Sequence, residues 1–145
     1  MFKRILVPID GSGFAIRALD AACSLVKEDE TRLILLHVVE DKPLDEELRQ
    51  YAEVEHLDRK NLPYSLGERI VEDAGARAAK SGAASVNCLV IEGDAASVIL
   101  ETAASEDVDL IVMGSRGLGT VKELLLGSVS HKVGQVAACA CMTVR

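Results

Sequence analysis

The 145-residue sequence has no tryptophan, and aromatic side chains make up only 3% of it. It also has no long hydrophobic run. Its apolar runs, such as residues 33–36, are no longer than a strand, whereas about 20 apolar residues are needed to cross a bilayer. Lys3 and Arg4 lead directly into a strand-like stretch, without the apolar segment of a secretory signal. We therefore expect a cytoplasmic protein without membrane insertion.

Positive charge is scarce as well, because 16 lysines and arginines stand against 23 acidic residues and give a formal net charge of −7. Nucleic acid rewards basic patches through counterion release, and the sequence offers no basic stripe to provide it. We expect no nucleic-acid partner. A phosphate ligand would have to be held locally, by backbone amides and a few polar side chains.

Metal-binding patterns are also missing. Four cysteines occur, without a CxxC motif or a histidine at ligand spacing. We expect no metal site and interpret the cysteines as reduced thiols that serve as small core residues. They are Cys23, Cys88, Cys139 and Cys141.

What the sequence does contain is a regular alternation of two patterns. Runs of branched apolar residues predict parallel strands buried on both faces, at residues 4–9, 32–39, 86–92, 109–113 and 142–144. Between them, apolar residues recur at helical spacing, which is typical of helices that pack on a sheet. These helical residues are Ala15, Ala18, Leu19, Ala22 and Val26; Leu66, Ile70, Ala74 and Ala78; Ala95, Ile99 and Ala103; and Val129, Val133 and Val136.

This alternation determines the predicted fold class. Right-handed crossovers between parallel strands predict an α/β protein with an open five-stranded parallel sheet and helices on both faces, as one domain over residues 1–145. Residues 40–61 stand apart, with eight acidic and four basic residues. They form either a solvated loop or a short helix with Leu44, Leu48, Tyr51 and Val54 on one side, as a partly ordered lid or partner contact.

Glycines gather after the fourth predicted strand, where a doubly wound sheet binds its ligands. Residues without Cβ reach positive φ and let an anion approach the backbone N–H groups, so we interpret this loop as a phosphate site. Ser128 is predicted to be the N-cap of the last helix, whose free N–H groups favour a phosphate, and Ser130 adds a hydroxyl donor. The loop residues are Met113, Gly114, Ser115, Arg116, Gly117 and Gly119, followed by Gly127, Ser128, Val129 and Ser130.

The end of the first strand faces the same crevice. There the chain reads Pro8, Ile9, Asp10, Gly11 and Ser12. Asp10 accepts hydrogen bonds from ribose hydroxyls, faces a metal-bound triphosphate, or merely caps the first helix together with Ser12. Arg116 either clamps a terminal phosphate or projects into solvent. We expect His37 to be a satisfied core histidine and His131 to lie on the surface.

Four segments together resemble the universal stress protein family over nearly the whole chain. They read KRILVPIDGS, LLHVVE, DLIVMGSRG and LLGSVSHKV, and the spacing Gly114-x2-Gly117-x9-Gly127-Ser128 is similar to the family's nucleotide motif. The resemblance implies strand order 3-2-1-4-5, a Rossmann-like adenine nucleotide-binding fold, and homodimers through the last strand, with tetramers as a further possibility. In the branch that carries these glycines it also implies binding of ATP or AMP.

Carried over to this sequence, the resemblance implies an adenine contact at the backbone of Val38 and a ribose contact at Asp10. The phosphate contacts fall on Gly114, Gly117, Gly127 and Ser128, with Val129 and Ser130 as further contacts. Two positions depart from the family pattern. Ala95 and Ala140 stand where proline is usual, and both changes restore a backbone donor.

Three functional hypotheses follow. The first is a regulatory dimer that binds ATP, ADP or AMP, with Mg²⁺ accompanying the triphosphate and an unidentified protein partner responding. The second is a slow ATPase or self-phosphorylating enzyme using Asp10, Ser128 or Ser130, for which the sequence shows no evident base. The third is an interaction module that binds no nucleotide. The glycine spacing favours the first, with no catalytic residue predicted.

Overall fold

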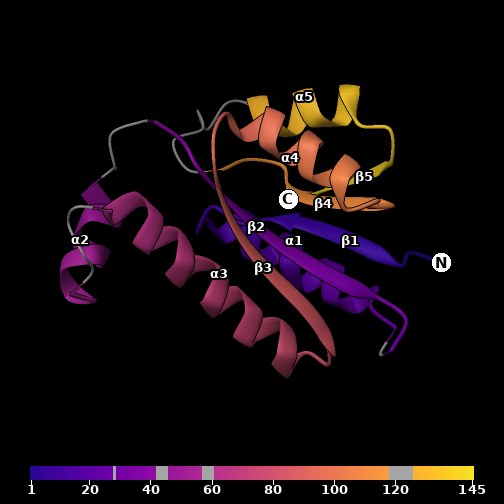
Figure 1. Ribbon diagram of the computed structural model, residues 1–145, viewed down its shortest axis with the longest axis horizontal. Helices are drawn as coiled ribbons and strands as arrows, with labels where there is room; N and C mark the ends of the chain where they lie inside the picture. The colour runs from indigo at the N-terminus through magenta and orange to yellow at the C-terminus, as the bar shows by residue number, and fades with distance from the viewer. Residues whose placement is uncertain (28, 42–45, 57–60, 118–125) are drawn as a thin grey trace.

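The computed structural model describes residues 1–27, 29–41, 46–56, 61–117 and 126–145. Its strands form one parallel sheet in the order β3-β2-β1-β4-β5, which confirms the predicted fold class and strand order (Figure 1). Only small boundary shifts separate the predicted strands from the observed ones. The strands are β1 (Arg4–Pro8), β2 (Arg32–Val39), β3 (Ser85–Glu92), β4 (Leu110–Gly114) and β5 (Ala140–Val144).

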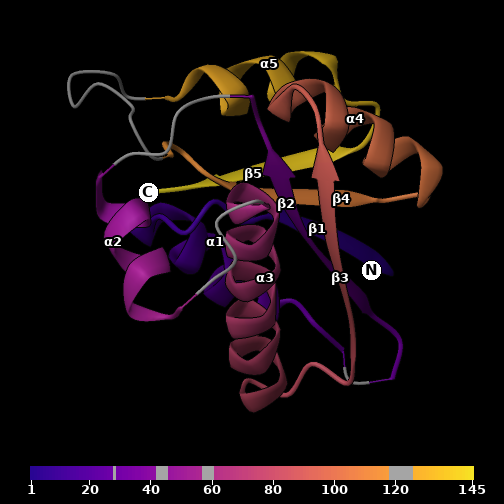
Figure 2. The same cartoon turned by 60° about the vertical axis from the view of Figure 1, so that its left-hand side comes forward.

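Helices cover both faces of the sheet. In Figures 1 and 2, α4 and α5 lie on one side, and α1, α2 and α3 lie on the other. Alternate strand residues divide the core accordingly. Residues such as Val7 and Leu35 pack under α1 and α3, whereas Leu6 and Leu36 pack under α4 and α5. The helices are α1 (Gly13–Ser24), α2 (Glu46–Val54), α3 (Leu62–Lys80), α4 (Ala95–Ser105) and α5 (Ser128–Val136).

The apolar stripes predicted from spacing are largely the buried faces of these helices. Most of the predicted residues of α1, α3 and α4 are buried, and Val133 of α5 is fully buried. Val136 is an exception, because it is 61% exposed at the end of α5. Two starts are fixed by side-chain caps: Ser12 Oγ accepts from Ala15 N at 3.2 Å, and Asp94 accepts from Ser97 N at 3.1 Å.

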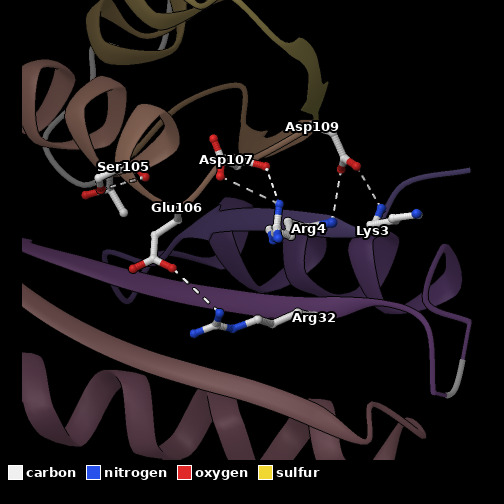
Figure 3. A network of polar contacts seen from close by, with 8 residues as sticks. Lys3, Arg4, Arg32, Ser105, Glu106, Asp107 and Asp109 are labelled. Atoms are coloured by element: carbon white, nitrogen blue, oxygen red, sulfur yellow. Dashed lines mark hydrogen bonds and ion pairs between the residues drawn. The ribbon is translucent and has the colours of Figure 1, made fainter.

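At the amino-terminal edge of the sheet, polar contacts join the α4–β4 turn to the neighbouring strands (Figure 3). The carboxylate of Asp109 accepts from the backbone N–H groups of Lys3 at 2.8 Å and Arg4 at 3.1 Å. Asp109 N in turn donates to Arg4 O at 3.0 Å. Arg32 and Glu106 form a looser ion pair at 3.8 Å. The carboxylate of Asp109 therefore fixes the start of β1 beside β4.

The acidic segment contains a helix, α2, which agrees with the second alternative rather than with a plain loop. Two hydrogen bonds join this region to α3: Tyr51 Oη of α2 donates to Asp73 at 3.3 Å, and Arg69 donates to Glu55, just after α2, at 2.9 Å. Val54 is 74% exposed, so the expected apolar side does not pack as a whole. Leu44 lies outside the described residues.

Two further expectations need correction. Cys88 is exposed rather than buried, because it lies on β3 at the sheet edge, while the other three cysteines are half-buried; all four are free thiols. The last strand begins at Ala140 and not at Met142, since Ala140 pairs with Leu110 in the β4–β5 ladder. Within the described part of the chain, no helix is long and apolar enough to span a membrane.

Candidate functional site at the carboxyl edge of the sheet

The site lies where the winding of the sheet reverses. β1 is the central strand, with β2 on one side and β4 on the other. The chain leaves β1 toward α1 and leaves β4 toward the glycine loop, so the two connections diverge from neighbouring strands at the same edge. Such divergence opens a crevice in parallel sheets. Residues 8–12 and 113–117 line its two sides.

Asp10 organises the turn that follows β1. Its Oδ1 accepts from Ser12 N at 2.9 Å, and Gly11 allows the turn with a φ of +87°. The helix cap itself comes from Ser12, whose hydroxyl accepts from Ala15 N. Asp10 is therefore not the cap of α1. Its other oxygen, Oδ2, lies on the side of Gly117.

Gly114 and Gly117 are required because neighbouring atoms lie too close for a Cβ. The prediction that they adopt positive φ is wrong. A Cβ on Gly114 would lie 2.7 Å from Phe14 Cβ and 2.8 Å from Phe14 C, because β4 ends directly against α1. A Cβ on Gly117 would lie 2.5 Å from Asp10 Oδ2. Neither residue is among the glycines with positive φ, which in the described chain are Gly11, Gly82 and Gly93.

The start of α5 completes the crevice. Gly127, not Ser128, is the N-cap: it has extended backbone (φ −69°, ψ 157°), and its carbonyl accepts the first helical bond from His131 N at 2.9 Å. Its own N–H donates to Ser115 O, which fixes the helix start against the end of β4. As a glycine, Gly127 provides no side-chain cap. The first amides of α5 therefore donate to no side-chain oxygen of their N-cap residue, which suits an anion.

The serines around the loop differ in their hydrogen bonding. Ser130 Oγ donates to Gly114 O at 2.7 Å, so its single proton ties α5 to β4 and is not available to a phosphate. Ser115 Oγ is buried and has no hydrogen-bond partner among the described residues. A buried hydroxyl without a partner costs free energy, so this atom is suited to a polar ligand.

On the other side of β1, the end of β2 presents backbone groups to the crevice. Ile9 N donates to Leu36 O at 2.8 Å, so Leu36 faces β1. Because N–H and C=O groups alternate in direction along a strand, Val38 faces β1 as well, beyond the last ladder pair of Pro8 with Leu36. The next acceptor, Ile9 O, is contacted by His37 Nδ1 at 2.8 Å.

His37 is half-buried and hydrogen-bonded, as expected for a satisfied core histidine. Burial lowers its pKa, while the bond to Ile9 O and the nearby carboxylates of Asp10 and Glu40 act in the opposite direction. Since a carbonyl oxygen only accepts, Nδ1 carries the proton in this contact. The prediction of a surface position for His131 is confirmed by its exposure.

Arg116 does not project into solvent as one alternative supposed. It is half-buried, and its guanidinium carbon lies 5.4 Å from the centre of the Phe14 ring, which Arg17 approaches from 4.6 Å. Arg17 Nε also donates to the carbonyl of Arg145 at 2.9 Å. No sequence pattern pointed to Phe14, because a single aromatic residue within a helix is usually explained by core packing.

The remaining predicted residues frame the crevice. Ile9 and Met113 are buried beneath it, and Val129 packs half-buried on the α4–α5 core; Pro8 is half-buried, and Ser128 is exposed. Gly119 lies outside the described residues.

Beyond Val38, a cavity of about 720 Å³ lies between the ends of β2 and β3 and the start of α3. Its lining carries Glu40, Asp41, Glu92 and Asp94, so it disfavours phosphate. Sequence reasoning missed this cavity, because its walls come from three separate segments.

These features define a class: a doubly wound α/β protein that brings backbone amides, one carboxylate and a helix N-terminus together at the carboxyl edge of its sheet. Comparison identifies the family. The model of the universal stress protein family matches residues 1–145, and the chain belongs to that family.

Individual relatives agree. The chain is 38% identical over 149 residues to the universal stress protein YxiE of Bacillus subtilis, with both chains fully covered. The solved structure of the protein MJ0577 superimposes with a TM-score of 0.81 at 30% identity, covering 99% of this chain and 96% of the other. A universal stress protein in complex with cAMP matches with a TM-score of 0.74 at 27% identity, covering 99% and 97%.

Proposed function

We propose that this chain binds an adenine nucleotide in the crevice between β1 and β4 and acts as a small regulatory protein. The observation that carries the proposal is the meeting, at one edge of the sheet, of the Val38 backbone, Asp10, the glycine loop and the start of α5. The related protein solved with cAMP supports an adenine nucleotide as the ligand class.

Each part of the nucleotide has a matching group. The N–H and C=O of Val38 offer one donor and one acceptor to the edge of the base, and Asp10 accepts from the ribose hydroxyls. The first amides of α5, at Ser128 and Val129, hold the phosphates together with Gly117, helped by the partial positive charge of the helix start, whereas the Gly127 N–H is already used by Ser115 O. The buried hydroxyl of Ser115 lies at the same loop and supplies a further polar contact.

These groups explain how an anionic chain can bind a polyanion. Backbone amides and a helix dipole provide positive potential without lysines, and the net charge of −7 remains elsewhere on the surface. With a triphosphate, Mg²⁺ is expected to neutralise phosphate charge through phosphate oxygens and water. No residue of this crevice is proposed as a catalytic base, so the expected activity is binding and not rapid turnover.

The regulatory unit is proposed to be a homodimer formed through β5. β5 is the edge strand of the sheet, so one side of its backbone is available to a second copy. Large apolar side chains are exposed beside it, since Val136 is 61% and Met142 is 37% exposed. Nucleotide binding at the end of β4 and the start of α5 would change the surface that this part of the molecule presents to a partner protein in the cytoplasm.

Calorimetric titration with ATP tests the binding site. Gly117→Ala places a Cβ against Asp10 Oδ2 and displaces the carboxylate from the loop. We expect a loss of ATP affinity of at least about tenfold, the cost of roughly one charged hydrogen bond, with an unchanged circular dichroism spectrum.

The matched control is Gly134→Ala in α5, where nothing lies within 4 Å of an added Cβ. This variant should bind ATP like the wild type and gain about 0.5–1 kcal/mol of stability, because alanine favours the helix. Wild-type protein that binds no ATP would point to the interaction module instead. ATP hydrolysis above the solution rate, measured with saturating Mg²⁺, would favour the enzyme.

A further inference from the structure

We infer that His37 is a positioning residue for base recognition. Its ring N–H donates to the carbonyl oxygen of Ile9, so the N–H and C=O of Val38 remain facing the crevice. The inference rests on the proposed function and deepens it, since it names the residue that makes the site selective for the base.

The argument starts from the β1–β2 ladder. In a regular parallel pair, the donor that follows Ile9 N→Leu36 O would be Val38 N–H, bonding to Ile9 O. Among the described residues, Val38 N–H makes no hydrogen bond to Ile9 O. The ring nitrogen of His37 lies 2.8 Å from that oxygen instead. A side chain thus substitutes for one ladder bond.

The ring is held in this position from the opposite side. Helix α3 passes so close over β2 that a Cβ on Gly67 would lie 2.6 Å from His37 Cδ2 and 3.0 Å from Val90 Cγ1. Glycine in the interior of a helix costs about 1 kcal/mol relative to alanine, so its use here has a packing reason. Gly67 provides the space for the imidazole beside α3 while its Nδ1 contacts Ile9 O.

The consequence is a recognition edge of defined chemistry. Val38 N–H and C=O face β1 just past the point where β1 has turned away toward Asp10. A planar ligand edge with an acceptor next to an amino donor, as in adenine, complements them. Guanine presents the reverse order, and attachment of the ribose at Asp10 prevents the base from turning round.

The decisive variants are His37→Leu and His37→Asn. Leucine has no donor, so we expect Val38 N–H to close the ladder onto Ile9 O. Asparagine places its amide nitrogen where Nδ1 stands and should preserve the wild-type arrangement. Gly67→Ala is the third variant, because it displaces the ring without altering it and remains informative if His37→Leu does not fold.

The first readout needs no nucleotide. Hydrogen exchange of the Val38 amide, followed by NMR, should be at least about tenfold slower in His37→Leu than in the wild type or His37→Asn, because the amide becomes hydrogen-bonded. Equal exchange in all three proteins would overturn the inference, whatever the nucleotide results.

The second readout is the ratio of ATP to GTP affinity from calorimetry. We expect His37→Leu and Gly67→Ala to lose about tenfold in ATP affinity and to keep their GTP affinity, so that the ratio falls, while His37→Asn keeps it. Parallel losses for both nucleotides would show a merely structural role and contradict the inference. Failure of the wild type to bind ATP would instead refute the proposed function and leave the exchange result standing.

Discussion

Single atoms decide the shape of this crevice. A Cβ added to Gly114 would collide with Phe14, one on Gly117 with Asp10, and one on Gly67 with His37. Sequence spacing marked the first two as unusual but attributed them to backbone conformation. The structure attributes them to packing, and this difference changes which substitutions are informative: alanine, the smallest side chain with a Cβ, is already large enough to disturb the site.

At the same scale, His37 makes stability depend on pH. Burial lowers its pKa below the ordinary value of 6.5, so between the two values the unfolded chain binds more protons than the folded one. The stabilising contribution is therefore fully present above about pH 6.5 and is lost as the pH falls toward the folded-state pKa. Denaturant unfolding from pH 7.5 to 5 should show a steeper loss in the wild type than in His37→Asn. Identical pH profiles would contradict this expectation.

Among elements, the amino-terminal edge of the sheet depends on one carboxylate. Asp109→Ala removes the acceptor of two backbone N–H groups at the start of β1, and we expect a loss of about 1–2 kcal/mol in the free energy of unfolding, measured with urea. ATP affinity should not change, because this edge is opposite the crevice.

The neighbouring Glu106→Gln is the matched control for Asp109→Ala. Its ion pair with Arg32 at 3.8 Å is partly exposed on both sides and should be worth less than about 0.5 kcal/mol. If both substitutions lower the free energy of unfolding by the same amount, the two hydrogen bonds from the backbone to Asp109 do not stabilise this edge.

The positions of the helices and strands were predicted from the sequence more accurately than the contacts between individual residues. Branched apolar runs located β1 to β4 to within one residue at each end, because a strand buried on both faces tolerates few other side chains. β5 began two residues earlier than predicted. Cys139, Ala140 and Cys141 lack the branched pattern, and a strand at the edge of the sheet does not need it.

The candidate site could be predicted only in part, for a related reason. Motif spacing indicated the loop and Asp10, but it could not show that Ser130 bonds to Gly114 O or that Gly127 is the N-cap of α5. It also missed the contact between His37 and Ile9, which lie 28 residues apart. Contacts between distant residues depend on strand register and helix packing, which spacing along the chain does not encode.

For the whole molecule, charge and the edge strand β5 bear on the proposed dimer. The net charge of −7 repels two chains, so a stable dimer needs a local apolar surface to offset it. Strand β5 offers an apolar side chain through the exposed Met142, and Val136 at the end of α5 is exposed as well. Ala140, in place of the family's usual proline, adds a backbone N–H to this strand.

Sedimentation equilibrium tests the proposed dimer. Met142→Lys puts a charge on the edge strand, which opposes strand pairing between copies, so we expect the dimer dissociation constant to rise at least about tenfold. Val54→Lys, at the end of α2, places the same charge at a position that is also exposed (74%) and should leave association unchanged. Because the edge strand follows directly on the nucleotide loop and α5, ATP should strengthen the wild-type dimer, and Gly117→Ala should abolish that effect. A wild type that sediments as a monomer at every concentration would disprove the dimer while leaving nucleotide binding open to its own test.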